Sequence, residues 1–263
     1  MIDMPSRRTF IESVAAGAAL NTISSPDAAS ASRQTAPRSR ARIQVFDVNE
    51  TLLDVTALEP HFVRVFGDGG VLREWFSTVL LFSEVATLAG PYSDFGAIGG
   101  AALEMTAAAR GLSLSADDRT RILTGMLSLP AHPDVRDGLR QLRNAGFRLV
   151  TLTNSSPKAV EQQLKNAGLA EFFDRAFSVD AVRRFKPAAE PYRYAASELK
   201  APVSSLRLIA AHAWDIVGAL QAGCVAAFVA RPGKVLYPLG PKPDIAGPDI
   251  PSVAAQVVKI DSA

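Results

Sequence analysis

The sequence predicts an α/β fold in which helices cover both faces of a parallel sheet and an all-helical segment follows the first strand. Short apolar runs, typical of buried strands, lie at residues 43–46, 147–152, 174–179, 206–210 and 225–229. Stretches with helical periodicity separate these runs. Strands that alternate with helices form parallel sheets that are buried on both faces. The exception is the stretch from 57 to 131, which has no clear strand.

The helical patterns between the runs are amphipathic. Val135, Leu139 and Leu142 share one face of a predicted helix, and Val160 and Leu164 share one face of the next. This spacing matches the 3.6-residue period of an α-helix. Each of these helices is therefore expected to present one apolar face to the sheet.

Residues 57–131 are predicted to form a helical cap. Helix-forming residues dominate at 71–89, 99–110 and 117–127. Because the segment follows the loop after the first strand, we expect it over the carboxyl edge of the sheet, where a lid excludes water and shapes a pocket. A decoration that only adds stability is the alternative. The predicted domains are a signal and linker at 1–42, a core at 43–56 plus 132–263, and the cap at 57–131.

The first 42 residues have a different character. Arg7 and Arg8 precede a mildly apolar stretch, 14–20, and Ala29-Ser30-Ala31 follows. Paired arginines, a weak apolar region and a small-residue cleavage pattern resemble a twin-arginine signal peptide, which implies a periplasmic protein. The apolar stretch is too short to span a membrane. The alternatives are a disordered basic tail and a misassigned start codon, either of which leaves the protein in the cytoplasm.

Composition excludes several classes of site. The 263 residues include 28 basic and 26 acidic side chains, a net charge of +2 that gives no electrostatic case for a nucleic-acid partner. Cys224 is the one cysteine, so the chain has no intramolecular disulfide and no cysteine-based zinc site. We expect Cys224 to be buried where a strand begins. His61, His132 and His212 show no metal-ligand spacing.

Polar side chains lie at the carboxyl ends of four predicted strands. Asp47 closes the first apolar run, and a carboxylate there can act as a covalent nucleophile. Open α/β sheets bind their ligands at this edge, so we expect the groups to meet there. Any one of them alone could be a helix cap, a turn residue or a surface side chain. The set comprises Asp47, Thr51, Thr153, Asn154, Lys186, His212 and Asp215.

Over residues 42–257 the chain resembles the haloacid dehalogenase superfamily, and within it the type II 2-haloacid dehalogenases. The motifs are Phe46-Asp47 with Thr51-Leu52, Leu152-Thr153-Asn154-Ser155-Ser156-Pro157, Phe185-Lys186-Pro187 and Ala213-Trp214-Asp215. The last is the most specific to the dehalogenase branch. The resemblance implies a Rossmann-like core with an inserted cap.

The resemblance also implies a reaction. Asp47 attacks C2 of an (S)-2-haloalkanoic acid from the rear, halide leaves, and water hydrolyses the resulting ester to an (R)-2-hydroxy acid. Lys186 keeps Asp47 ionised by lowering its pKa. Thr51 hydrogen-bonds the nucleophile, and Asp215 holds Lys186 and orients water. No cofactor or metal is implied, and the family is often dimeric.

The implied substrate contacts come from two regions. Thr153 and Asn154 hold the substrate carboxylate, and Tyr192 matches a family tyrosine that lines the site. Trp214 is expected to pack in the core. In the cap, the family arginine that assists halide departure aligns with Phe76, close to Phe95.

Three departures from the family pattern affect the site, and one of them is Ala210, where the family often has serine. Phe76 cannot supply a cation, whereas Arg73, one helical turn earlier, is a candidate replacement. His212 stands where the family typically has asparagine. A neutral imidazole there could bind water or act as a base, and a histidine satisfied by the backbone is the alternative.

Asn49 separates the predicted reaction from phosphate chemistry. Phosphatases of the superfamily have a second aspartate at this position, which protonates the leaving alcohol, and a carboxamide cannot do so. Ala210 and Ala211 also leave few hard oxygen ligands for magnesium near the fourth strand. A hydrolase of another small substrate, such as a phosphoester, and a carboxylate-binding relative without activity are the alternatives.

Overall fold

The computed structural model describes residues 41–262. The predicted twin-arginine signal lies outside these residues, apart from its last two positions. Between residues 41 and 262, no helix is long and apolar enough to cross a membrane.

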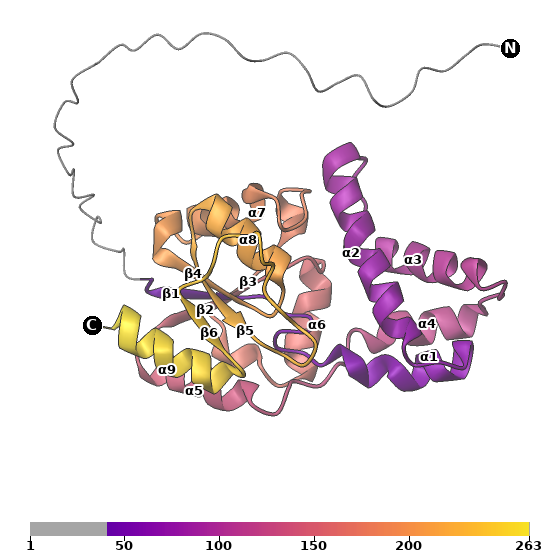
Figure 1. Cartoon of the computed structure of the whole chain (residues 1–263), viewed down its shortest axis with the longest axis horizontal. Helices are drawn as coiled ribbons and strands as arrows, with labels where there is room; N and C mark the ends of the chain where they lie inside the picture. The colour runs from indigo at the N-terminus through magenta and orange to yellow at the C-terminus, as the bar shows by residue number, and fades with distance from the viewer. Residues whose placement is uncertain (1–40, 263) are drawn as a thin grey trace, which may run out of the picture. The chain divides into compact units, whose positions relative to one another are not determined.

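The sheet is parallel throughout and has six strands in the order β3-β2-β1-β4-β5-β6 (Figure 1). Phe46, at the end of β1, lies opposite Thr151 and Ile209 on the two neighbouring strands. β2 and β3 lie on one side of β1, and β4, β5 and β6 lie on the other, so the strand order reverses between β1 and β4 and forms a topological switch point there. The strands are β1 (Ile43–Phe46), β2 (Arg148–Thr153), β3 (Arg175–Ser178), β4 (Leu206–Ala210), β5 (Val225–Val229) and β6 (Ile245–Gly247).

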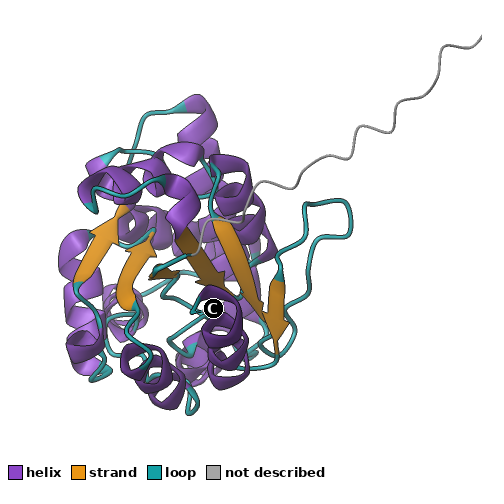
Figure 2. Ribbon diagram, turned by 90° about the vertical axis from the view of Figure 1, so that its left-hand side faces the viewer, coloured by secondary structure: helices purple, strands orange, loops and turns teal. Residues whose placement is uncertain are grey.

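Helices cover both faces of the sheet, as predicted (Figure 2). Alternate strand residues point to opposite faces, so Val45 and Phe46 belong to different apolar clusters. The cluster around Val45 includes residues of α7 (Ala189–Glu198) and α8 (Ala213–Ala222). The cluster around Phe46 includes residues of α5 (Val135–Asn144), α6 (Pro157–Asn166) and α9 (Ile250–Asp261).

An all-helical cap is inserted between β1 and α5. Trp75 fixes its interior, because the indole is buried and donates to the carbonyl of Gly99 at 2.9 Å. The apolar cluster around Phe46 continues into this cap, so cap and sheet share one core. The cap elements are η1 (Val55–Leu58), α1 (Glu59–Phe66), α2 (Val71–Ala89), α3 (Phe95–Ala109) and α4 (Ala116–Gly125).

The observed elements differ from the predicted ones mainly at their ends. Helix α3 begins at Phe95, four residues before the predicted start at 99, because the Asp94 side chain caps it by accepting from the amide of Ala97 at 3.0 Å. Strand β6 was not predicted. Its three residues, Ile-Ala-Gly, carry no periodicity that a pattern could detect. Three short 3-10 helices complete the structure: η2 (Ala170–Phe172), η3 (Val179–Ala181) and η4 (Val203–Ser205).

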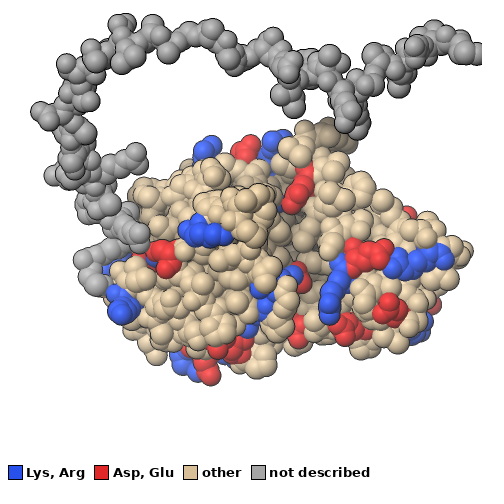
Figure 3. Space-filling model, in the orientation of Figure 1, with Lys and Arg blue, Asp and Glu red and all other residues tan. Residues whose placement is uncertain are grey.

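Charges of both signs are interspersed on the face shown in Figure 3. Exposed ion pairs on the cap include Arg110 with Glu74 and Arg119 with Glu104. Exposed pairs of this kind contribute little to stability but keep a surface mixed in charge. Cys224 is buried immediately before β5, as expected, and burial raises the pKa of its thiol to about 12.

Candidate active site

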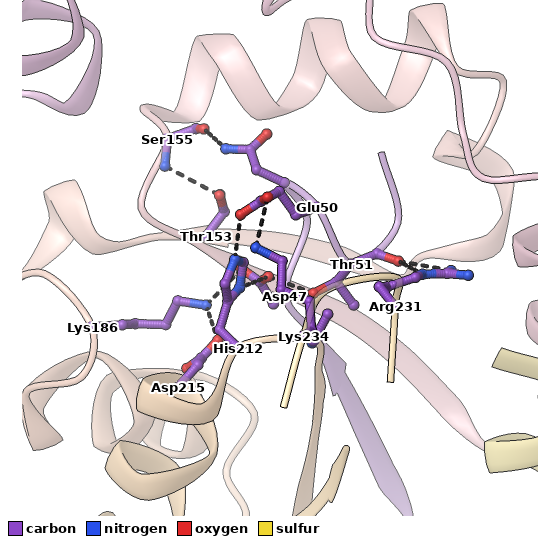
Figure 4. Close-up of polar contacts among 12 residues, drawn as sticks. Asp47, Glu50, Thr51, Thr153, Ser155, Lys186, His212, Asp215, Arg231 and Lys234 are labelled. Carbon is purple, nitrogen blue, oxygen red and sulfur yellow. Dashed lines mark hydrogen bonds and ion pairs between the residues drawn. The ribbon is translucent and has the colours of Figure 1, made fainter. Parts of the chain in front are cut away.

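Asp47 lies at the carboxyl end of β1, where the backbone amide of Asp47 donates to the carbonyl of Ile209 at 3.1 Å. Only 4% of the residue is exposed. Both carboxylate oxygens are engaged (Figure 4). Lys186 Nζ donates to Oδ1 at 3.0 Å, and Thr51 Oγ1 donates to Oδ2 at 2.6 Å. His212 Nδ1 lies 3.1 Å from the same Oδ2.

The surroundings of Asp47 favour its ionised form. Burial by itself would raise the pKa of the carboxyl group. The charge of Lys186 and the hydrogen bonds from His212 and Thr51 outweigh burial and hold the pKa of Asp47 well below its usual range. Asp47 is therefore a carboxylate at neutral pH.

Lys186 is buried between two carboxylates, so the interpretation of this residue as a surface lysine is wrong. Its ammonium group lies 3.0 Å from Asp47 Oδ1 and 2.6 Å from Asp215 Oδ2. Burial would lower the pKa of Lys186, but the charges of Asp215 and Asp47 raise it above its usual value. The backbone amide of Lys186 donates to Asn154 Oδ1 at 3.1 Å, which ties this loop to the end of β2.

Asp215 lies in the first turn of α8 rather than at the cap position, which His212 occupies. Its second oxygen, Oδ1, accepts from the Tyr192 hydroxyl at 2.5 Å, and neither residue is more than 1% exposed. A side chain at Gly218 would collide with this hydroxyl, because a Cβ there would lie 2.7 Å from it. Tyr192 therefore lies behind Asp215, and its predicted role in substrate binding stays a prediction.

Thr51 links the loop after β1 to two other segments. Its hydroxyl, besides donating to Asp47, accepts from the amide of Ala211 at 2.9 Å. Its carbonyl accepts from the Arg231 guanidinium at 2.9 Å, and Arg231 also pairs with Asp134 at 2.6 Å. The loop is thus fixed to the ends of β4 and β5.

Two residues near Asp47 were not predicted from the sequence. The Glu50 carboxylate lies 2.7 Å from His212 Nε2 and accepts from Lys234 Nζ at 2.7 Å. Glu50 follows Asp47 closely in the sequence, but Lys234 lies in a loop after β5 that carries no strand-end motif.

Trp214 stacks on the His212 ring with 4.9 Å between ring centroids, so it packs beside the site and not in the core as expected.

His212 is cationic at neutral pH. Burial would lower the pKa of its imidazole, but hydrogen bonds and charges from Asp47 and Glu50 raise it to about 9. The side chain thus has two carboxylate partners and is not a histidine satisfied by the backbone.

A hydrogen-bond network holds the end of β2. Asn49 Nδ2 donates to Ser155 Oγ at 3.2 Å, and Asn49 Oδ1 accepts from Gln163 Nε2 at 3.0 Å. Thr153 Oγ1 accepts from the amide of Ser155 at 3.1 Å. Thr153 and Asn154 are almost fully buried at this edge of the sheet.

A small apolar cavity of about 90 Å³ lies between cap and core. Phe76 and Phe95 line it from the cap, and Ser155 and Ser156 line it from the end of β2. The rings of Phe76 and Phe95 pack edge to face at 6.4 Å. A second cavity of about 400 Å³ is lined by Arg73 and Phe76, together with Glu50 and Lys234. Arg73 therefore lines the same cavity as the Glu50–Lys234 pair.

Within residues 41–262, no group of three or more His, Cys, Asp and Glu side chains is arranged to hold a metal ion. His61 lies on α1 in the cap, and His132 contacts the carbonyl of Glu50 at 3.3 Å. That the reaction needs no metal or cofactor stays a prediction.

Comparisons with known proteins give consistent matches. The model of the haloacid dehalogenase-like hydrolases matches residues 42–223. The (S)-2-haloacid dehalogenase of Pseudomonas sp. (strain YL) is 30% identical over 201 residues, which cover 76% of this chain and 87% of that protein. (S)-2-haloacid dehalogenase 1 of Pseudomonas sp. (strain CBS-3) is 33% identical over 180 residues, 68% of this chain and 79% of that protein.

A solved structure is also similar to this chain. The L-2-haloacid dehalogenase of Xanthobacter autotrophicus with chloropropionic acid covalently bound superposes with a TM-score of 0.77 at 25% identity, covering 82% of this chain and 98% of that one. The family model covers well over half of the present chain. The chain belongs to the haloacid dehalogenase-like hydrolases.

Proposed function

We propose that the chain removes halide from small (S)-2-haloalkanoic acids and releases (R)-2-hydroxy acids through an ester on Asp47. The observation that carries this proposal is a buried carboxylate at the strand end, 3.0 Å from a buried lysine, with Asn49 two residues later. The names of the similar (S)-2-haloacid dehalogenases support the same substrate class.

In the first step, an oxygen of Asp47 forms a bond to C2 while the carbon–halogen bond breaks, and halide leaves with the electron pair. Attack from the rear inverts C2, which converts the (S) acid to the (R) product. Halide is stable as an anion and needs no proton. The side chain of Asn49 cannot act as a general acid, and both ends of its amide are hydrogen-bonded, to Ser155 and Gln163. This favours halide over alkoxide as the leaving group.

In the second step, water attacks Cγ of Asp47, and the bond between Cγ and the ester oxygen breaks. Lys186 holds Asp47 ionised for the first step and is itself held by Asp215. Thr51 donates to Asp47 and positions its carboxylate. Tyr192 fixes the second oxygen of Asp215.

We assign the substrate to the space between Asp47 and the small cavity. Phe76 and Phe95 would contact its apolar part and limit it to a short chain. Thr153 and Asn154 would hold its carboxylate at the end of β2. Arg73 would attract the anionic substrate from the second cavity, which it lines with Lys234.

Halide release is the test of this function. The full chain, assayed with (S)-2-chloropropionate in excess EDTA, is expected to release chloride, and Asp47→Asn is expected to lose this activity by about a thousandfold or more. A single turnover with enzyme in excess in ¹⁸O-labelled water should place the label in Asp47 and leave the product unlabelled. Absence of chloride release together with Mg²⁺-dependent hydrolysis of a phosphoester would contradict the proposal.

We also propose, from the sequence, an export signal, domain boundaries and an oligomeric state. Residues 1–42 comprise a twin-arginine signal and a linker, which places the mature protein in the periplasm, and N-terminal sequencing of the exported protein would locate the cleavage. The cap extends over 57–131, and the core comprises 43–56 plus 132–263. The active form is a homodimer, which sedimentation equilibrium would detect.

A further inference from the structure

Six charged side chains form a row of alternating sign through the site. In order they are Asp215, Lys186, Asp47, His212, Glu50 and Lys234, and every neighbouring pair lies 2.6–3.1 Å apart. Figure 4 shows the His212 ring between the carboxylates of Asp47 and Glu50. The proposed reaction assigns roles to Asp215, Lys186 and Asp47. It assigns none to His212, Glu50 and Lys234.

Glu50 has an unusual backbone conformation that places its side chain beside His212. Its φ is 61°, in the left-handed region that glycine adopts without cost. A residue with a side chain adopts this conformation only at an energetic cost. Here the carboxylate of Glu50 reaches His212 Nε2, and Lys234 holds its other oxygen. Glu50 therefore fixes the orientation of the imidazole and keeps a proton on Nε2, which leaves Nδ1 facing Asp47.

The position of His212 excludes one role and favours another. In an in-line displacement the halide departs on the far side of C2 from the attacking oxygen. His212 Nδ1 lies 3.1 Å from Asp47 itself, on the near side, so it cannot receive the halide while it stays there. The near side is where water must approach Cγ of the ester. His212 is therefore placed for the hydrolytic step.

Asp215 is poorly placed to accept a proton from this water. One of its oxygens is bonded to Lys186 and the other to Tyr192, and the residue is 0% exposed. His212 is 5% exposed, and its neighbour Glu50 lines a cavity of about 400 Å³. Of the two candidates, His212 is the more exposed and is the one bonded to a residue that lines a cavity.

We propose that His212, oriented by Glu50, is the general base that activates water for hydrolysis of the Asp47 ester. This inference rests on the proposed function. The charged groups around the imidazole are Asp47 and Glu50, which contact it, with Lys186 and Lys234 beyond them.

The charge of Asp47 sets when His212 can act. Before the first step the carboxylates of Asp47 and Glu50 hold the imidazole in its protonated form. Esterification removes the charge of Asp47, so the pKa of His212 falls and the Nδ1 proton leaves to solvent. Nδ1 is then a base beside the ester, with Nε2–H still bonded to Glu50.

The hydrolytic step then balances. The water oxygen bonds to Cγ of Asp47 while one water proton passes to Nδ1 of His212. The bond from Cγ to the substrate oxygen breaks, and this oxygen takes the proton back to form the hydroxy acid. The second water proton, on the new Asp47 carboxyl group, moves to Nδ1 and restores the starting ion pair. Each turnover consumes one water and releases one halide and one proton.

Rapid-quench kinetics with (S)-2-chloropropionate and the full chain test this role. His212→Asn, which introduces the residue typical of the family, should release one chloride per site at a rate within about threefold of the wild type. Its steady-state turnover should fall about 100-fold or more, and intact-protein mass spectrometry should detect the accumulated ester. His61→Asn, in the cap, is the matched control and should behave as the wild type.

Glu50→Gln tests whether Glu50 positions His212. It also provides the decisive measurement if His212→Asn does not fold. It should slow ester hydrolysis about tenfold and shift the pH dependence of that step to lower pH, because removal of a negative charge lowers the pKa of His212. A purely structural role for Glu50 would not shift this profile. The inference is wrong if His212→Asn turns over as fast as the wild type. It is also wrong if the rate of the first chloride release falls by the same factor as the steady-state turnover. In both cases the proposed function stands. Absence of chloride release by the wild type would instead remove the proposed function.

Discussion

Two histidines contact Glu50, and their pKa values are shifted in opposite directions. His212 lies between two carboxylates, and its pKa rises to about 9. Partial burial and the nearby charge of Arg231 lower the pKa of His132 below 6.5. Their contributions to stability must therefore depend on pH with opposite signs.

For His212 the folded state holds the proton more tightly than the unfolded state. The stabilisation is fully present below pH 6.5 and is lost as pH rises towards 9 and above. We expect the difference in unfolding free energy between wild type and His212→Asn to shrink over this window by roughly 3 kcal/mol. Urea denaturation at a series of pH values measures this difference.

His132→Asn provides the matched comparison. Because the folded state binds this proton less tightly, the difference between wild type and His132→Asn should grow as pH rises towards 6.5. Equal slopes for the two variants would mean that His212 is not held between two ionised carboxylates.

At the residue scale, sequence reasoning located Asp47 and its partners but not their neighbours. Asp47, Thr51, Lys186, His212 and Asp215 were predicted at one sheet edge, and the structure brings them together. Their positions follow from strand ends, which apolar runs reveal. The contacts of Glu50 and Lys234 depend on loop conformations that no period encodes.

At the scale of elements, the packing of α5 against α9 depends on one glycine. A Cβ at Gly138 would lie 2.9 Å from the carbonyl carbon of Ile250 and would overlap its side chain. Gly138→Ala should gain about 1 kcal/mol of helix propensity. The overlap with backbone is expected to cost more, so the variant should lose a net ~1–3 kcal/mol of unfolding free energy.

Gly99 in α3 is the control for this effect. A Cβ there meets only Leu123 and Trp75, at 3.7 and 3.8 Å, which are ordinary contact distances. Gly99→Ala should therefore be neutral or stabilising by up to about 1 kcal/mol. Urea unfolding of both variants separates the two cases, and a stabilised Gly138→Ala would show that α9 can move away from α5.

The same scale explains where prediction of the fold succeeded and failed. Strands β1, β4 and β5 match the predicted apolar runs at both ends. Helix α3 was predicted to begin too late because its first turn is apolar and glycine-rich, and the Asp94 cap decides its start. Local patterns specify elements with one clear apolar face, whereas tertiary contacts determine short strands and helix ends.

At the scale of the whole described chain, the cap is tied to the core close to Lys186. Thr87, near the end of α2, accepts from the backbone amide of Phe185 at 2.9 Å. The Tyr92 hydroxyl donates to Asp180 just beyond β3. These hydrogen bonds connect the cap to the segment between β3 and α7 that carries Lys186.

Thr87→Val removes the acceptor at this junction without a large change in side-chain volume. The buried amide of Phe185 then lacks a partner, which should lower the unfolding free energy by about 1–3 kcal/mol. The loop that carries Lys186 loses a support at the same time, so chloride release should slow by about tenfold, since small displacements of a catalytic group are costly. Calorimetry and steady-state chloride release measure the two effects.

Thr106→Val separates this coupling from the simple loss of a buried hydroxyl. Thr106 is also a buried cap threonine, but its hydroxyl donates to Ala102 in its own helix at 2.8 Å. Because that carbonyl belongs to the same helix, the substitution should cost less than about 1 kcal/mol and leave chloride release unchanged. If both variants lose activity equally, Thr87 acts only through cap stability. If Thr87→Val alone slows the reaction, the cap positions Lys186 through the Phe185 amide.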